Sequence, residues 1–161
     1  MKKICLIALT LFSFTITSQA QAIADHAIGL RLGDSDGFGA EISYQVGLFD
    51  THRLEFGLGW RDGGKYSAIR AVGLYQWVKP LDDRFNWYTG VGGGIASYSL
   101  DNVAPGEDDS STSFLAAGNI GIEYDFNIPL LISLDFRPEF GFGHINNDLD
   151  FDIALGLRYQ F

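Results

Sequence analysis

Cysteine, proline, methionine and long apolar runs are all scarce in this sequence. The 161 residues include one Cys, one Met and four Pro, and the single cysteine, Cys5, lies in the first apolar segment. The chain beyond that segment therefore offers no disulfide, no thiol nucleophile and no cysteine metal ligand. No later stretch reaches the ~18 apolar residues that a membrane-spanning helix needs. Helix-forming Lys, Glu and Met are also sparse, which argues against a helical fold.

The N-terminal segment has the features of a secretory signal peptide. Two lysines precede an apolar run over Ile4–Ile16, and small residues follow it. The run is too short to be a membrane-spanning helix. We predict a signal peptide over residues 1–20, cleaved after Ala20 or, as the alternative, after Ala22, which leaves 21–161 as one domain.

The predicted mature domain is acidic and rich in glycine. Removal of the two leader lysines leaves nine basic residues against 20 acidic ones, a formal charge of −11. A chain with this negative charge does not bind the phosphate groups of a nucleic acid. Twenty glycines and 14% aromatic residues, distributed in short alternating runs, indicate an all-β fold.

Eight runs alternate with period two between apolar residues and polar or small ones, which is the pattern of a strand with two different faces. The last run, Phe151–Phe161, places Phe, Ile, Leu, Leu, Tyr and Phe on one face, and eleven residues suffice for a tilted strand to cross a bilayer. The predicted strands are His26–Gly33, Phe38–Val46, His52–Trp60, Tyr66–Val78, Phe85–Tyr98, Phe114–Phe126, Leu130–Gly143 and Phe151–Phe161. Short polar turns separate them, except for one long loop over Ser99–Ser113.

The charged residues of these runs all fall on the non-apolar face. A cation on the lipid side of a barrel costs roughly 2–4 kcal/mol at the bilayer midplane, and open strand edges find no partner in lipid. We therefore predict a closed cylinder in hydrocarbon with its charges turned inward. The predicted lumen charges are Arg31, Glu41, Arg53, Glu55, Arg70, Glu123, Asp125, Asp135, Arg137, Glu139, Asp152 and Arg158.

With its strand count, leader, aromatic residues and closing Leu157-Arg158-Tyr159-Gln160-Phe161, the chain resembles the OmpA/OmpX-type eight-stranded outer-membrane β-barrel superfamily. The resemblance implies an up-and-down antiparallel transmembrane barrel in the bacterial outer membrane, with both termini in the periplasm. It also implies that Leu157, Tyr159 and Phe161 form the signal read by the barrel-insertion machinery. Outer-membrane lipids, including lipopolysaccharide, are the other expected partners of a monomer.

Two hypotheses explain the charged residues that face inward. They could line a gated path for ions or small solutes, or they could form a paired plug that holds a narrow lumen shut. We expect the plug, and with it a structural or interaction role without enzymatic activity. A narrow small-solute channel is an alternative, and a soluble lipocalin-like barrel is another.

Three further features are candidate sites. The acidic outer loops, with Asp108 among them, could bind divalent cations but match no calcium-loop spacing, so we expect no metal and no cofactor. His144 lies near Ser113 in the predicted topology and could serve a lipid A-modifying barrel enzyme; we expect no catalytic residue. Pro138 interrupts a strand, and we expect a β-bulge there.

Overall fold

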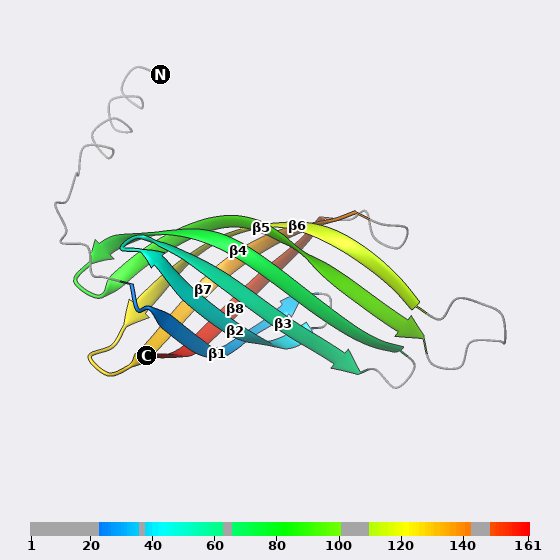
Figure 1. Cartoon of the computed structure of the whole chain (residues 1–161), viewed down its shortest axis with the longest axis horizontal. Coiled ribbons are helices and arrows are strands. Elements are labelled where there is room, and N and C mark those ends of the chain that lie inside the picture. Colours follow the sequence, from blue (N-terminus) through cyan, green and yellow to red (C-terminus); the bar gives the residue numbers. More distant parts are fainter. Residues whose placement is uncertain (1–22, 36–37, 63–65, 101–109, 143–148) are drawn as a thin grey trace, which may run out of the picture.

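The computed structural model describes residues 23–35, 38–62, 66–100, 110–142 and 149–161. Within these ranges the regular structure consists of eight antiparallel strands closed into one barrel in the order β1 to β8, with β8 paired to β1 (Figure 1). No helix in the described part of the chain is long and apolar enough to cross a membrane. The strands are β1 His26–Ser35, β2 Phe38–Phe49, β3 His52–Asp62, β4 Tyr66–Asp82, β5 Phe85–Leu100, β6 Ser110–Asp125, β7 Leu130–Phe142 and β8 Leu149–Gln160.

Both described ends of the chain lie at one end of the barrel, which we call the terminus end (Figure 1). His26 and Phe161 exchange backbone hydrogen bonds there, at 3.2 and 2.9 Å. The seam between β1 and β8 then runs from the pair Ala27–Gln160 to the pair Leu32–Leu155. The connections β2–β3, β4–β5 and β6–β7 turn at this end, and the opposite end is called the loop end.

The period-two pattern gives the barrel an apolar outside and a polar inside. Exposed side chains include Ile69, Val91 and Ile153, at 59%, 58% and 66% of their full exposure. Among the strand residues whose side chains are described, only Lys79 and Asp82 have an exposed charged side chain, and both lie at the end of β4 next to the turn. The predicted charge-free outer face is therefore confirmed between the two ends of the barrel, where the exposed side chains of the described residues form an apolar belt.

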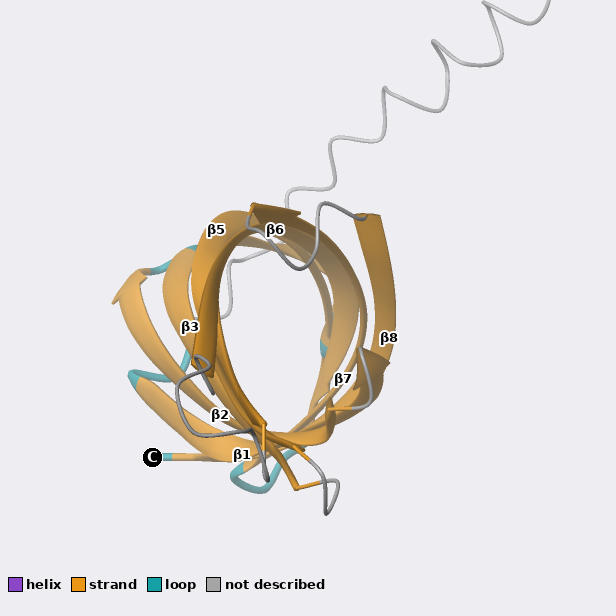
Figure 2. Ribbon diagram, turned by 90° about the vertical axis from the view of Figure 1, so that its right-hand side faces the viewer, coloured by secondary structure: helices purple, strands orange, loops and turns teal. Residues whose placement is uncertain are grey.

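The cross-section is elongated, with β5 and β6 at one narrow end and β1 and β2 at the other (Figure 2). Glycine is required at these corners. A Cβ added at Gly92 or Gly94 of β5 would lie 1.9 or 2.2 Å from a carbonyl oxygen of β4, and one added at Gly29 of β1 would lie 1.9 Å from a carbonyl oxygen of β8. The sheet can bend this sharply because these inward positions carry no side chain.

Several predicted boundaries were wrong. β5 continues to Leu100 and β6 begins at Ser110, so the long loop is shorter at both ends than predicted. β4 runs through Pro80 to Asp82, with a register shift in its pairing to β5 between these two residues. The turn between β4 and β5 therefore contains only Asp83 and Arg84. The strand can include Pro80 because this residue lies near the strand end, where a missing N–H is tolerated.

The bulge expected at Pro138 is also absent. The pairing of β7 with β6 lapses between the pairs Ala117–Glu139 and Ile120–Phe136 but resumes in the same register. On its other side, Pro138 pairs with Phe151 of β8 in an unbroken ladder. Proline cannot donate a ladder hydrogen bond, and here the loss is confined to one edge of the strand without an extra residue.

Candidate functional site

The structure buries eleven of the twelve predicted lumen charges inside the barrel. Five arginines and six carboxylates are each at most 6% exposed among the described residues. Asp125, the twelfth, is half-buried at the terminus end, where it lines the mouth of the barrel. The site is the set of contacts among these buried groups. The eleven are Arg31, Glu41, Arg53, Glu55, Arg70, Glu123, Asp135, Arg137, Glu139, Asp152 and Arg158.

One group of contacts is centred on Glu41 of β2, and we call it the Glu41 cluster: Arg31, Glu41, Arg70, Asp135, Arg137, Glu139 and Asp152. The carboxylate of Glu41 receives three guanidinium groups. Arg137 Nη1 lies 3.1 Å and Arg31 Nη1 lies 3.6 Å from its Oε2, and Arg70 Nη2 bonds to its Oε1. This carboxylate therefore holds together strands that are distant along the barrel wall.

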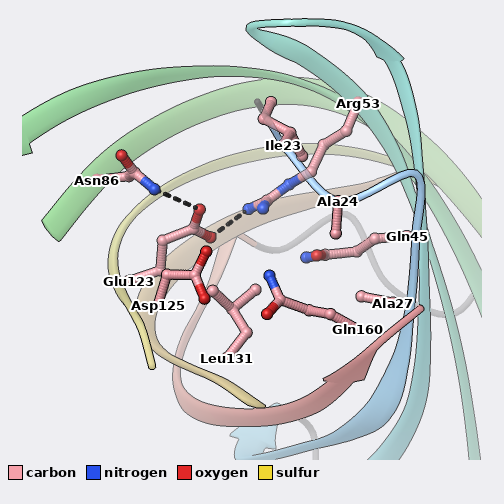
Figure 3. A pocket seen from close by; sticks show the side chains of 10 residues that line it. All are labelled: Ile23, Ala24, Ala27, Gln45, Arg53, Asn86, Glu123, Asp125, Leu131 and Gln160. Atoms are coloured by element: carbon pink, nitrogen blue, oxygen red, sulfur yellow. Dashed lines mark hydrogen bonds and ion pairs between the residues drawn. The ribbon is translucent and has the colours of Figure 1, made fainter. Parts of the chain in front are cut away.

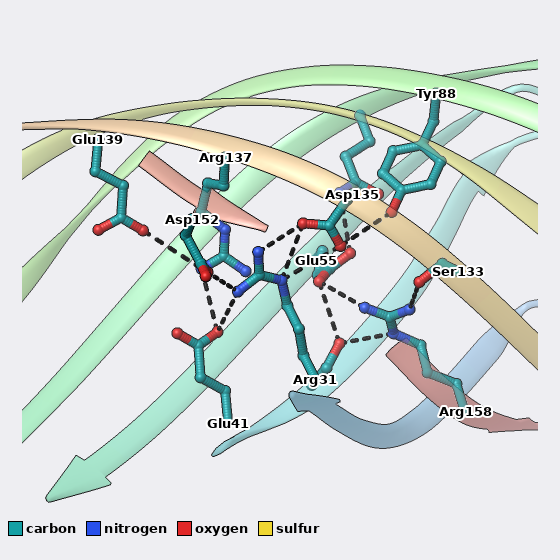
Figure 4. A network of polar contacts seen from close by, with 12 residues as sticks. Arg31, Glu41, Glu55, Tyr88, Ser133, Asp135, Arg137, Glu139, Asp152 and Arg158 are labelled. Carbon is teal, nitrogen blue, oxygen red and sulfur yellow. Dashed lines mark hydrogen bonds and ion pairs between the residues drawn. The ribbon is translucent and has the colours of Figure 1, made fainter. Parts of the chain in front are cut away.

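Arg31 has the matching role among the cations of the Glu41 cluster (Figure 4). Its Nη2 donates to Asp135 Oδ1 at 2.6 Å, its Nε donates to the same oxygen at 3.1 Å, and its Nη1 donates to Asp152. At the loop-end side of the cluster, Arg70 Nη1 donates to Glu139 Oε2 at 2.9 Å. Planar guanidinium groups suit such multidentate pairing with carboxylates.

A second group, the Glu55 cluster, lies toward the terminus end and contains Ser43, Gln45, Arg53, Glu55, Gln76, Glu123, Ser133 and Arg158. Glu55 accepts from Arg158 Nη2 at 2.9 Å, from Gln45 at 2.8 Å and from Gln76 at 2.9 Å. Arg158 also donates to the hydroxyls of Ser43 and Ser133, at 2.8 and 2.7 Å. Neutral side chains therefore add hydrogen bonds to the charged groups of Glu55 and Arg158.

Arg53 and Tyr88 connect the parts of the lumen. Arg53 Nη2 lies 2.8 Å from Glu123 Oε2, its Nε donates to Gln76 at 2.6 Å, and its guanidinium carbon lies 4.7 Å from the ring centre of Tyr88. The Tyr88 hydroxyl donates to Asp135 Oδ2 at 3.2 Å, which joins the Glu55 cluster to the Glu41 cluster. The polar contacts thus run without a break from Glu123 to Glu139.

This arrangement suits mutual neutralisation of charge. Removing an arginine or carboxylate from water is costly unless it is paired and hydrogen-bonded, and each of the eleven groups has at least one oppositely charged partner. No group of three or more His, Cys, Asp or Glu side chains in the described ranges is arranged to hold a metal ion.

The predicted site contained only the charged residues of the inward face and left out its uncharged members. Tyr88, Gln76 and Ser43 are fully buried, and Ser133 and Gln45 are nearly so. Each lies on the inward face of its strand, so the alternation that places the charges in the lumen places these side chains there as well. The predicted signal peptide, His144, Asp108 and the other acidic residues of the long loop lie outside the described residues.

The terminus-end rim carries aromatic and histidine side chains. His26 stacks on Tyr44 and on Phe161, with ring centres 6.0 and 5.6 Å apart, and its Nδ1 lies 3.0 Å from the Tyr44 hydroxyl. His52 Nδ1 lies 2.6 Å from the Tyr75 hydroxyl in the same way. Amphipathic rings of this kind suit the interface between hydrocarbon and water.

Known structures share this architecture. The N-terminal β-barrel domain of Pseudomonas aeruginosa OprF superposes with a TM-score of 0.66 at 14% identity, covering 88% of this chain and all of that one. The chain has the fold of the eight-stranded outer-membrane β-barrels. Neisserial surface protein A (TM-score 0.60, 13% identity, 84% of this chain and 94% of that one) and Ail of Yersinia pestis (0.53, 15%, 84% and 96%) are similar to it as well.

No protein-family model and no curated protein sequence matches the chain. The likeness to these barrels is therefore one of fold, and the lumen must be interpreted from its own side chains. The expectation of a closed eight-stranded up-and-down barrel is confirmed.

Proposed function

We propose that this protein is an integral outer-membrane barrel with a lumen closed by paired charges, and that its role is structural or interaction-based rather than catalytic or transporting. The observation that carries the proposal is the unbroken set of contacts from Glu123 through Tyr88 to Glu139. Side chains of this size fill the interior of an eight-stranded barrel, and their ion pairs would have to separate before a solute could pass.

The location and orientation follow from the same physical reasoning. The charge-free belt of exposed apolar side chains supports hydrocarbon as the outer solvent, and the fold supports the bacterial outer membrane. The resemblance to outer-membrane barrels favours a periplasmic position for the terminus end. The partners under this proposal are outer-membrane lipids, including lipopolysaccharide, and the insertion machinery, for which Leu157, Tyr159 and Phe161 would be the signal.

Planar-bilayer recording of the refolded protein tests the closed lumen. We expect no steady single-channel current from the wild type. The matched variant combines Arg31→Ser with Asp135→Ser, which removes one cation and one anion joined at 2.6 Å. It keeps the net charge of the lumen and shortens two inward side chains. We expect the variant to conduct at least intermittently. Steady wild-type conductance would favour the small-solute channel instead.

A further inference from the structure

Residues that precede the first strand line the mouth of the lumen at the terminus end. Ile23 and Ala24 line a cavity of about 10 Å³ together with Ala27, Gln45, Arg53 and other inward side chains (Figure 3). A cavity of this size holds about one water molecule. The remaining lining residues are Asn86, Glu123, Asp125, Leu131 and Gln160. Ile23 and Ala24 are themselves half-buried.

Two sets of backbone contacts direct this segment across the mouth. His26 is tied to Phe161 at the seam through two hydrogen bonds. One residue earlier, the carbonyl oxygen of Asp25 accepts a hydrogen bond from the Gly47 N–H of β2 at 2.9 Å. A Cβ at Gly47 would lie only 3.0 Å from the carbonyl oxygen of Ala24, so a side chain there would crowd the segment. The path over the mouth therefore depends on glycine at this position.

The side chains that line this cavity take part in buried polar contacts. Arg53 and Glu123 form an ion pair at 2.8 Å, and Gln45 donates to Glu55 at 2.8 Å. Ion pairs are stronger when water is excluded from them. Ala27 and Leu131, 2% and 3% exposed, add apolar surface beside the same cavity.

We propose that Ile23–Asp25 is a strap that closes the terminus end of the lumen, with Gly47 of β2 as its attachment point. The strap is held by one backbone hydrogen bond, from the Gly47 N–H to the Asp25 carbonyl oxygen, and by the half-burial of Ile23. It is therefore a weaker barrier than the ion-pair clusters above it. This inference depends on the geometry of the mouth and not on the proposed role of the barrel. Water and small reagents should reach the Arg53–Glu123 pair when the strap is displaced.

Thiol accessibility tests the strap. In a background without Cys5, the one cysteine of the chain, Ala27→Cys places a small reporter in the cavity wall. The probe is a charged methanethiosulfonate reagent, applied to the folded protein in detergent micelles. Ile23→Glu should displace the strap, because it adds a carboxylate to a cavity that Glu123 and Asp125 already line. We expect labelling of the reporter to accelerate by about tenfold or more, as for a local opening.

Matched variants separate displacement of the strap from general loosening. Ile23→Leu keeps the side chain apolar and should leave the labelling rate unchanged. Ala96→Cys, a reporter that is also buried (4% exposed) but does not line the mouth, should label slowly in all backgrounds. If Ile23→Glu does not give a heat-modifiable folded band, Gly47→Val replaces it. The strap is refuted if the Ala27 reporter labels as fast in the wild type as an exposed Asp50→Cys, or if displacing variants leave its rate unchanged.

Discussion

Replacing Glu41 with Gln should destabilise the barrel more than any other single loss of a lumen carboxylate. The substitution keeps the size of the side chain and removes the charge that faces Arg31, Arg70 and Arg137. The new amide group also brings hydrogen-bond donors toward guanidinium groups that only donate. Three cations would then share the remaining carboxylates of the Glu41 cluster.

The magnitude follows from the burial of these groups. Glu41 is 2% exposed, and its three arginine partners are at most 3% exposed. Breaking a buried ion pair by removing one partner costs about 3–5 kcal/mol, and the loss of a carboxylate shared by three cations belongs at the upper end of that range. Because a typical domain has a free energy of unfolding of about 5–15 kcal/mol, the variant should still fold but should unfold at a much lower urea concentration.

Urea unfolding in lipid vesicles, with the midpoint and slope both fitted, measures this effect. Glu123→Gln is the graded comparison, because one arginine, Arg53, contacts that carboxylate, and we expect a smaller loss. Asp83→Asn, in an exposed turn, is the surface control and should stay within about 0.5 kcal/mol of the wild type. A Glu41→Gln midpoint equal to that of Asp83→Asn would refute the view that these charges hold the barrel together.

Three further changes test other parts of the fold. Gly92→Val should abolish the heat-modifiable folded band, because its Cβ would lie 1.9 Å from a carbonyl oxygen; Gly39→Ala, whose Cβ would meet nothing nearer than 3.9 Å, should fold normally. Ile120→Arg, on the exposed apolar face of β6, should lower the free energy of unfolding by about 2–4 kcal/mol. Ile128→Arg, in the turn at the terminus end, should lower it by about 1 kcal/mol or less. Urea titration measures both changes. Phe161→Ala should reduce the fraction of folded barrel in outer-membrane extracts, since it removes the ring that stacks on His26 and, under the proposal, part of the insertion signal; an unchanged fraction would argue against both roles.

The alternation of residues in the sequence was enough to predict the strands and which side of each strand faces the lumen. The reason is that the two sides of each strand meet different solvents. A charge such as Arg70 or Glu139 is tolerated on the inward side and costly on the lipid side, so the pattern is enforced along every strand. The same pattern also places Tyr88 and Gln76 on the inward face, although it does not show that they join the charge network.

The partners of each charge were decided by the closed tertiary structure. Arg31 and Asp135 are 104 positions apart in the chain and meet only because the stagger of the strands brings β1 and β7 side chains to one level of the lumen. Period-two alternation contains no information about that stagger. Likewise, the attachment of Ile23–Asp25 at Gly47 and the unchanged register across Pro138 depend on pairing with neighbouring strands. The sequence by itself determined which side chains enter the lumen, and the tertiary structure decided which of them touch, because contact across a barrel depends on closure and not on local pattern.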